Sequence, residues 1–252
     1  MQQVILTPEE LFYLCSSLGA AEIFGVDDVF YGMTDAEIAE RMQKAGESLG
    51  ARGFAQMDFD GIGTLEEELL ALIRPFALCR QHIVSDITVK GKDHTGFQFY
   101  SMEDAMVRLI KNEDGTLEVH AVTGGEAASL LTRAFHISDM PGSADAPFIA
   151  QQTELDAAKR KKDIRTSLTA LGCGEAMAEI IAAGLREEGV YHSVVATDFT
   201  NMEMPIQTFL CLSCPNGMLQ IVPVLDGGEE SMEFRNIGAE DVRTHIARLL
   251  NE

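Results

Sequence analysis

The sequence predicts an α+β fold in which helices flank an antiparallel sheet. Apolar residues recur at helical spacing in the first third of the chain, and the pattern changes to alternation after Phe76. An order of helices, four strands and one helix then appears a second time. The repeated order suggests an old duplication within one domain of 252 residues. Its halves would be about 1–138 and 149–252, sharing one sheet, with a turn-rich linker at 139–148.

Capping boxes open the first two predicted helices. Thr7 is followed by Glu10 three residues later, and Thr34 is followed by Glu37 at the same spacing. In this arrangement the threonine hydroxyl accepts a hydrogen bond from the backbone N–H of the third helical residue. The glutamate carboxylate accepts a hydrogen bond from the backbone N–H of the cap residue. Each box is followed by apolar residues at helical spacing, so we expect two amphipathic helices here.

The stretch QMDFDGIGTLEE, residues 56–67, has part of the pattern of a calcium-binding loop. Gln56 stands where the first carboxylate of such a loop belongs, and Gly50 and Gly53 interrupt the preceding helix. We therefore predict no specific calcium site at Asp58 and Asp60.

The same stretch is better explained as the start of a third helix. Thr64 would be its N-cap and Glu67 its third residue, with the acidic first turn that the helix dipole favours. Pro75 is expected to end the helix.

Alternating segments then predict two sets of four strands. In the first half they are 82–89, 96–102, 106–112 and 117–123, with a hairpin turn at Asn112–Gly115 and a helix after Thr123. In the second half, helices at about 153–170 and 174–188 precede strands at 191–199, 206–214, 219–226 and 231–237. Cys214–Gly217 is expected to form a hairpin turn, and Gly238 opens a final helix.

The composition excludes several classes of partner. The net charge of −21 repels nucleic acid and anionic membranes, so neither is expected as a partner. Residues 1–68 carry fourteen Asp and Glu against three basic residues, which indicates either a solvated acidic surface or one that faces a partner. The N-terminus lacks signal-peptide features and the five cysteines are scattered, so we expect a cytoplasmic protein.

No motif predicts catalysis, a metal site or a cofactor. The six histidines are dispersed, and the chain has no phosphate-binding loop and no nucleophile elbow. Cys211 and Cys214 form a C-x-x-C, but the pair precedes a hairpin rather than a helix. Residues three apart on a strand face opposite sides of the sheet, so we expect neither zinc nor a disulfide there. A redox role of the pair is left open.

Two further features allow more than one interpretation. Lys159–Lys162 and Arg165 form the basic cluster, which fits either a solvated helix or a docking patch. Twelve methionines, including Met202 and Met204 beside Pro205, fit either an adaptable binding surface or core filling.

Several stretches together resemble a known family. They are LTPEELFYLCSSLG, MTDAEIAERMQKAGESLGARGF, LEEELLALIRPF, LTALGCGEAMAEIIAAGL and IGAEDVRTHIARLL, in that order. Their order resembles that of the EspG-like secretion-associated chaperones of type VII (ESX) systems along most of the chain. The second-half strands lack the Gly-Arg-Tyr-type stretch of actinobacterial members, and no Trp lies near the last strand, as in a divergent firmicute-type relative.

The resemblance implies a quasi-twofold EspG-like fold with a central antiparallel sheet flanked by helical bundles. It also implies no enzymatic activity. The expected function is that of a cytosolic chaperone or adaptor, and the expected partner is a small helical secreted protein of the type VII system. The oligomeric state is left open.

We expect the partner at two places, through a helix-in-groove or helix-end contact. One is the linker after the first predicted strand, with Lys90, Lys92 and His94, and the other is the helix that bears Met177, Ile180 and Ile181. The same helical spacing also fits a core role. The alternative functions are an acidic immunity protein that neutralises a secreted toxin, and an enzyme with an unrecognised carboxylate or Cys site.

Overall fold

The computed structural model describes residues 2–56, 64–89, 95–135, 146–186, 188–200, 203–226 and 229–250. The chain forms two compact units. Unit 1 comprises Met1–Ile83, Phe97–Thr123 and Thr197–Pro205, and unit 2 comprises Val84–Gly96, Gly124–Ala196 and Ile206–Glu252. The fold is α+β, with a large antiparallel sheet and helices, as the sequence predicts. Whether the two sequence halves arose by duplication stays a prediction.

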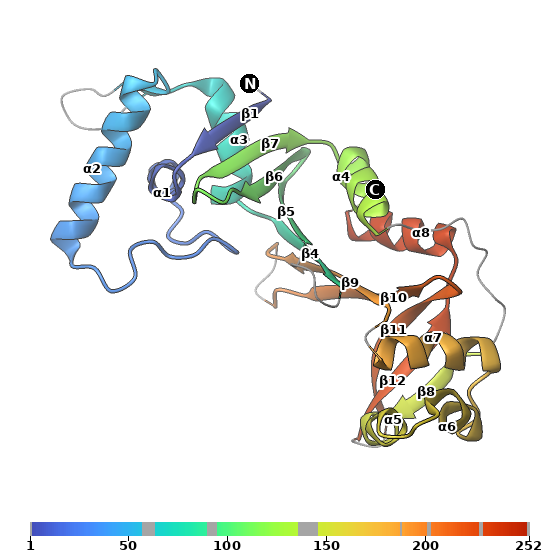
Figure 1. Cartoon of the computed structure of the whole chain (residues 1–252). Coiled ribbons are helices and arrows are strands. Elements are labelled where there is room, and N and C mark those ends of the chain that lie inside the picture. Colours follow the sequence, from blue (N-terminus) through green and yellow to red (C-terminus); the bar gives the residue numbers. More distant parts are fainter. Residues whose placement is uncertain are drawn as a thin grey trace. The chain divides into compact units, whose positions relative to one another are not determined.

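Unit 1 contains the N-terminal helices and strands (Figure 1). Its elements are β1 (Gln3–Leu6), α1 (Pro8–Ser17), α2 (Asp35–Ala51), β2 (Ala55–Gln56), β3 (Thr64–Leu65), α3 (Glu67–Ala77), the start of β4 (Gln81–Val89), β5 (Thr95–Met102), β6 (Ala105–Lys111) and β7 (Leu117–Val122). The main strands follow the order β1-β7-β6-β5-β4, and β2 pairs with β3 apart from them.

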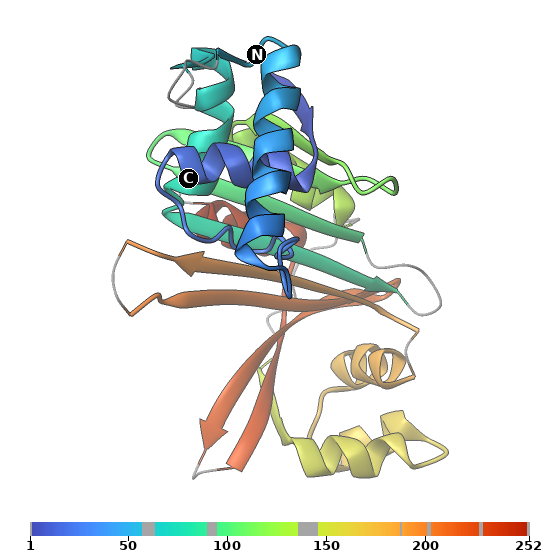
Figure 2. The same cartoon turned by 90° about the vertical axis from the view of Figure 1, so that its left-hand side faces the viewer.

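Unit 2 contains the rest of β4 and the remaining elements, except that the last two residues of β9 belong to unit 1. These elements are α4 (Gly124–Ala134), β8 (Phe148–Gln151), α5 (Gln152–Lys159), α6 (Ile164–Ala170), α7 (Glu175–Leu185), β9 (Val190–Asp198), β10 (Ile206–Cys214), β11 (Gly217–Asp226), β12 (Glu229–Asn236) and α8 (Ala239–Leu249). Its strands follow the order β4-β9-β10-β11-β12-β8. Figure 2 shows β11 and β12 as a long hairpin.

Both predicted capping boxes are confirmed. The Glu10 N–H donates to Thr7 Oγ1 at 3.2 Å, and the Thr7 N–H donates to Glu10 Oε2 at 2.9 Å. Thr34 and Glu37 make the same reciprocal pair at the start of α2. Each box satisfies backbone donors that have no partner within the helix.

Thr34→Ala is expected to lower the free energy of unfolding by about 1 kcal/mol. The Thr34 side chain accepts from the Glu37 N–H, and alanine leaves that donor to water. Chemical denaturation followed by circular dichroism measures the change. Thr34→Ser keeps the hydroxyl and should stay close to the wild type. An equal loss in both variants would show that the methyl group matters and the cap does not.

The prediction for the third helix is wrong at both ends. Thr64 lies in β3, where it pairs with Gln56 of β2, and the N-cap of α3 is Glu66. Pro75 lies inside α3, because the Leu78 N–H bonds to the Arg74 carbonyl at 2.8 Å and closes one more turn. The burial of Phe76 in that turn provides the packing that holds it.

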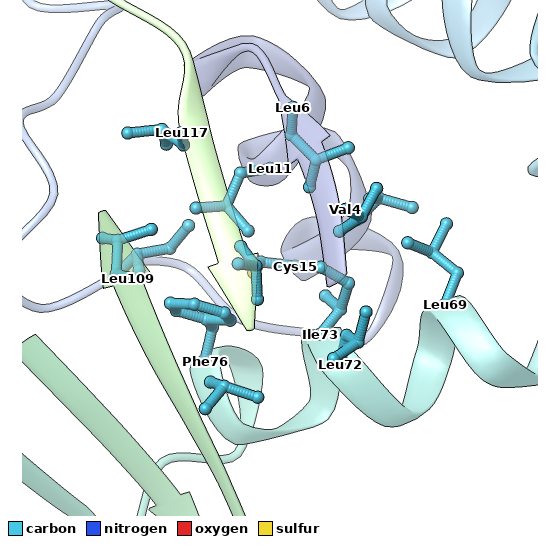
Figure 3. Packing of buried hydrophobic residues seen from close by; sticks show 14 of the residues in the cluster. Val4, Leu6, Leu11, Cys15, Leu69, Leu72, Ile73, Phe76, Leu109 and Leu117 are labelled. Carbon is cyan, nitrogen blue, oxygen red and sulfur yellow. The ribbon is translucent and has the colours of Figure 1, made fainter. Parts of the chain in front are cut away.

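The core of unit 1 lies between α1, α3 and the strands β1, β6 and β7 (Figure 3). Glu10 is buried at 2% exposure within this unit. Its carboxylate accepts from Ser48 Oγ at 2.7 Å and from Arg52 Nη1 at 2.8 Å, which links α1 to the end of α2. The buried charge is therefore paired and hydrogen-bonded, as burial requires.

All eight predicted strands are present, each within one or two residues of its expected ends. The predicted turn at Asn112–Gly115 is confirmed, with Gly115 at φ +84, and Cys214 pairs with Gly217 across the second predicted turn. Most of the predicted linker at 139–148 lies outside the described residues, but Phe148 begins strand β8, which the sequence did not predict.

The basic cluster does not lie on one helix as expected. The predicted helix at 153–170 is two helices, since α5 ends at Lys159 and α6 begins at Ile164. Asp163 starts α6, because its carboxylate accepts from the Thr166 N–H at 3.0 Å. A local cap therefore divides the segment. Lys161 and Lys162 lie in the connection between the helices.

Candidate functional site

An apolar groove lies on one face of the sheet of unit 2. It consists of two neighbouring cavities of about 340 and 430 Å³. The two cavities share Gln152 at the start of α5 and Met232 on β12, so they adjoin. We call this pair of cavities the apolar groove and name them the inner and the outer cavity. Concave, mostly apolar surfaces of this kind are typical binding sites.

The inner cavity lies between α5, α7 and the strands. Its lining residues are Leu155 of α5, Ile181 and Leu185 of α7, Leu210, Cys211 and Leu212 of β10, Ile221 of β11, Phe234 of β12, Asp86 and Thr88 of β4, Tyr191, His192 and Ser193 of β9, and the two shared residues. Gly184 permits α7 to approach the sheet closely, because a Cβ there would clash with the Leu212 side chain. The helix thus forms one wall of the cavity.

The outer cavity lies along the end of the β11–β12 hairpin. Pro223, Val224 and Leu225 of β11 line it together with Glu230 and Ser231 of β12. Leu225 is 81% exposed, the second most exposed large apolar side chain among the described residues. An exposed apolar side chain that continues an apolar cavity enlarges the apolar surface available to a partner.

The strand register explains why these apolar side chains share one face. Leu210 pairs with Ile221, and Ile221 pairs with Phe234. Residues directly opposite each other on neighbouring strands project from the same side of the sheet. Leu225 lies four residues beyond Ile221, so it projects from this side too.

The thiols of Cys211 and Cys214 and the imidazole of His192 are polar groups at or near the groove. Burial raises the pKa of the Cys211 thiol to about 12, and burial also raises the pKa of Cys214, so both thiols are protonated at neutral pH. His192 Nε2 lies 2.8 Å from Ser213 Oγ, and its ring contacts Phe135 at 4.5 Å. That neither cysteine holds zinc or a disulfide stays a prediction.

The carboxyl groups with clearly shifted pKa values belong to caps, turns and exposed ion pairs. Hydrogen bonds from Thr116 lower the pKa of Asp114, and hydrogen bonds from Thr200 lower the pKa of Asp198. A general acid at neutral pH needs the opposite shift. Within the described ranges, no group of three or more His, Cys, Asp or Glu could hold a metal ion. The stretch Asp58–Gly63 lies outside those ranges.

Of the predicted partner-binding residues that the structure describes, Ile181 alone lines the groove. Lys90, Lys92 and His94 lie outside the described residues. Met177, Ile180 and Ile181 are each 2% exposed and belong to the core of unit 2, with Ile181 also lining the inner cavity. The structure therefore places these three side chains in the core rather than on an open surface, because α7 packs against β10 and β11.

Sequence reasoning did not identify the groove residues of the hairpin. The alternation on β11 predicts an apolar face that includes Ile221 and Leu225. It does not show which part of that face the helices of the same chain leave open.

No described helix is both long and apolar enough to cross a membrane.

The chain has the fold of a protein whose structure has been solved. No protein-family model and no curated protein matches the chain. Among solved structures, it is similar to the Mycobacterium tuberculosis type VII secretion system chaperone EspG5, solved in complex with the PE25–PPE41 dimer. The match has a TM-score of 0.64 and covers 99% of this chain and 96% of the other at 10% identity. An α+β fold similar to that of EspG5 is therefore confirmed.

Proposed function

We propose that this protein is a cytosolic type VII secretion-associated chaperone that binds a helical secretion substrate and performs no chemistry. The observation that carries the proposal is the similarity of fold to EspG5 over nearly the whole of both chains. That structure contains a bound PE25–PPE41 dimer, so a fold of this kind can carry a protein partner. A large number of unrelated functions can share a fold, so the site must supply the second argument.

The apolar groove supplies that argument. It offers two adjoining cavities with mostly apolar lining and an exposed leucine at one end. Helical partners bind such grooves through an apolar stripe, which also protects that stripe from aggregation. The thiols beside the groove are protonated at neutral pH, which favours binding over nucleophilic catalysis.

Co-expression tests the proposal. The tagged protein is produced together with each small helical secretion substrate encoded in the same locus, and each substrate is also produced alone. One substrate is expected to co-purify with the protein and to become more soluble in its presence. Circular dichroism of the purified protein shows that it is folded.

Two outcomes contradict the chaperone function. In one, the folded protein retains none of the substrates and changes the solubility of none. In the other, it captures and neutralises a toxin from the same locus, which supports an immunity protein with an acidic binding surface.

A further inference from the structure

We infer that the apolar groove takes one amphipathic helix of the partner, with two large apolar side chains about two turns apart and Lys or Arg beside them. The inference rests on the proposed function and specifies the chemistry of the partner. Three observations carry it: the adjoining cavities, their spacing along β11, and the charge of the residues that line them.

The spacing of the cavities sets the spacing of the anchors. Ile221 lines the inner cavity and Leu225 the outer one, and both lie on β11. Four strand residues span about 13 Å. A helix rises about 1.5 Å per residue, so seven or eight residues cover about 11–12 Å. Residues at i and i+7 also share one helix face, so one anchor can enter each cavity.

The charge at the groove indicates which side chains stand beside the apolar anchors of the partner's helix. Asp86 lines the inner cavity and Glu230 the outer one, while no Lys or Arg is among the described residues that line either. The chain as a whole carries −21. Basic side chains beside the anchors therefore complement the groove and speed association. A second copy of this acidic chain is the wrong occupant, because like charges would meet.

Labelled helical peptides test the spacing and the charge. The first peptide has two Phe at i and i+7 with Lys on both flanks, the second has the two Phe at i and i+5, and the third replaces each Lys by Glu. Fluorescence anisotropy with the purified full chain should show binding of the first peptide, weakened by salt. The other two are expected to bind about 10-fold more weakly or worse.

Two substitutions on opposite faces of the sheet test where the peptide binds. Leu225→Ser removes the exposed leucine of the outer cavity and should weaken the first peptide about 5-fold or more. Ile149→Ser is the matched control, because Ile149 is 55% exposed and pairs with Glu233, so it projects from the opposite face. This control should bind like the wild type. Both side chains are largely exposed, so neither change should unfold the protein.

The inference is wrong if the three peptides bind equally, if none binds, or if both variants weaken binding to the same extent. It fails separately from the proposed function. A substrate that co-purifies equally with the wild type and with Leu225→Ser would leave the chaperone function standing and remove the groove as its site. If the protein bound the first peptide but captured no substrate, the groove would remain a helix-binding site and the chaperone function would be contradicted.

Discussion

Leu69→Ala is expected to lower the free energy of unfolding of unit 1 by about 2–5 kcal/mol. Leu69 lies on α3, is fully buried, and belongs to the cluster of Figure 3. Alanine removes the apolar contacts of the side chain and leaves a cavity that the neighbouring residues fill only partly. Urea denaturation followed by circular dichroism measures the change.

Leu70→Ala is the control for this core variant. Leu70 is the next residue of the same helix and is only partly buried. The helix propensity changes equally in both variants, so the difference between them reports burial. If the two variants lost the same free energy, the cluster around Leu69 would not be the core that stabilises unit 1.

The stability of the wild type is expected to fall by about 2 kcal/mol between neutral pH and pH 5 because of His82 alone. Burial lowers the pKa of His82 from 6.5 to about 4. Its ring is 7% exposed and stacks on Tyr100 at 4.5 Å, and Nε2 has no hydrogen-bond partner among the described groups. A proton on this imidazole would therefore be a buried charge without compensation.

The sign follows from the two pKa values. Above pH 6.5 His82 is neutral in both states and contributes its full stability. Below that pH, His82 becomes protonated in the unfolded chain but stays neutral in the folded chain. The free energy of unfolding therefore decreases as the pH falls toward about 4. His82→Phe keeps a ring and removes the titration, so its denaturation midpoint should change less with pH. Identical pH profiles of the two proteins would contradict this.

Local signals in the sequence predicted much of the fold. A threonine and a glutamate three residues apart predict a helix start, because both hydrogen bonds form within one turn. This held at Thr7 and Thr34. It failed at Thr64, where pairing between β2 and β3 determines the local structure instead. That pairing joins residues on either side of an intervening segment, so a local pattern does not reveal it.

The short strands β1 and β8 were missed for a related reason. Each has four residues and pairs along one side, β1 with β7 and β8 with β12. A four-residue alternation is too short to separate a strand from a loop. The decisive hydrogen bonds come from partners far away in the sequence.

The groove was the least predictable part. Leu219 and Leu225 lie on the same face of β11 and look alike in the sequence. In the structure Leu219 is fully buried and Leu225 is almost fully exposed. Which of two equivalent leucines remains open depends on where helices from other parts of the chain pack, and that is a tertiary property.

Neither unit is a continuous piece of chain, and this affects how the protein is made. Unit 1 needs Thr197–Pro205, whose Phe199 stacks on Phe24 at 4.2 Å. A ribosome releases the chain from its N-terminus, so the first unit stays incomplete until residue 205 has emerged, long after its helices have been synthesised. A single cut of the chain anywhere between residues 84 and 205 would therefore divide both units between the two fragments.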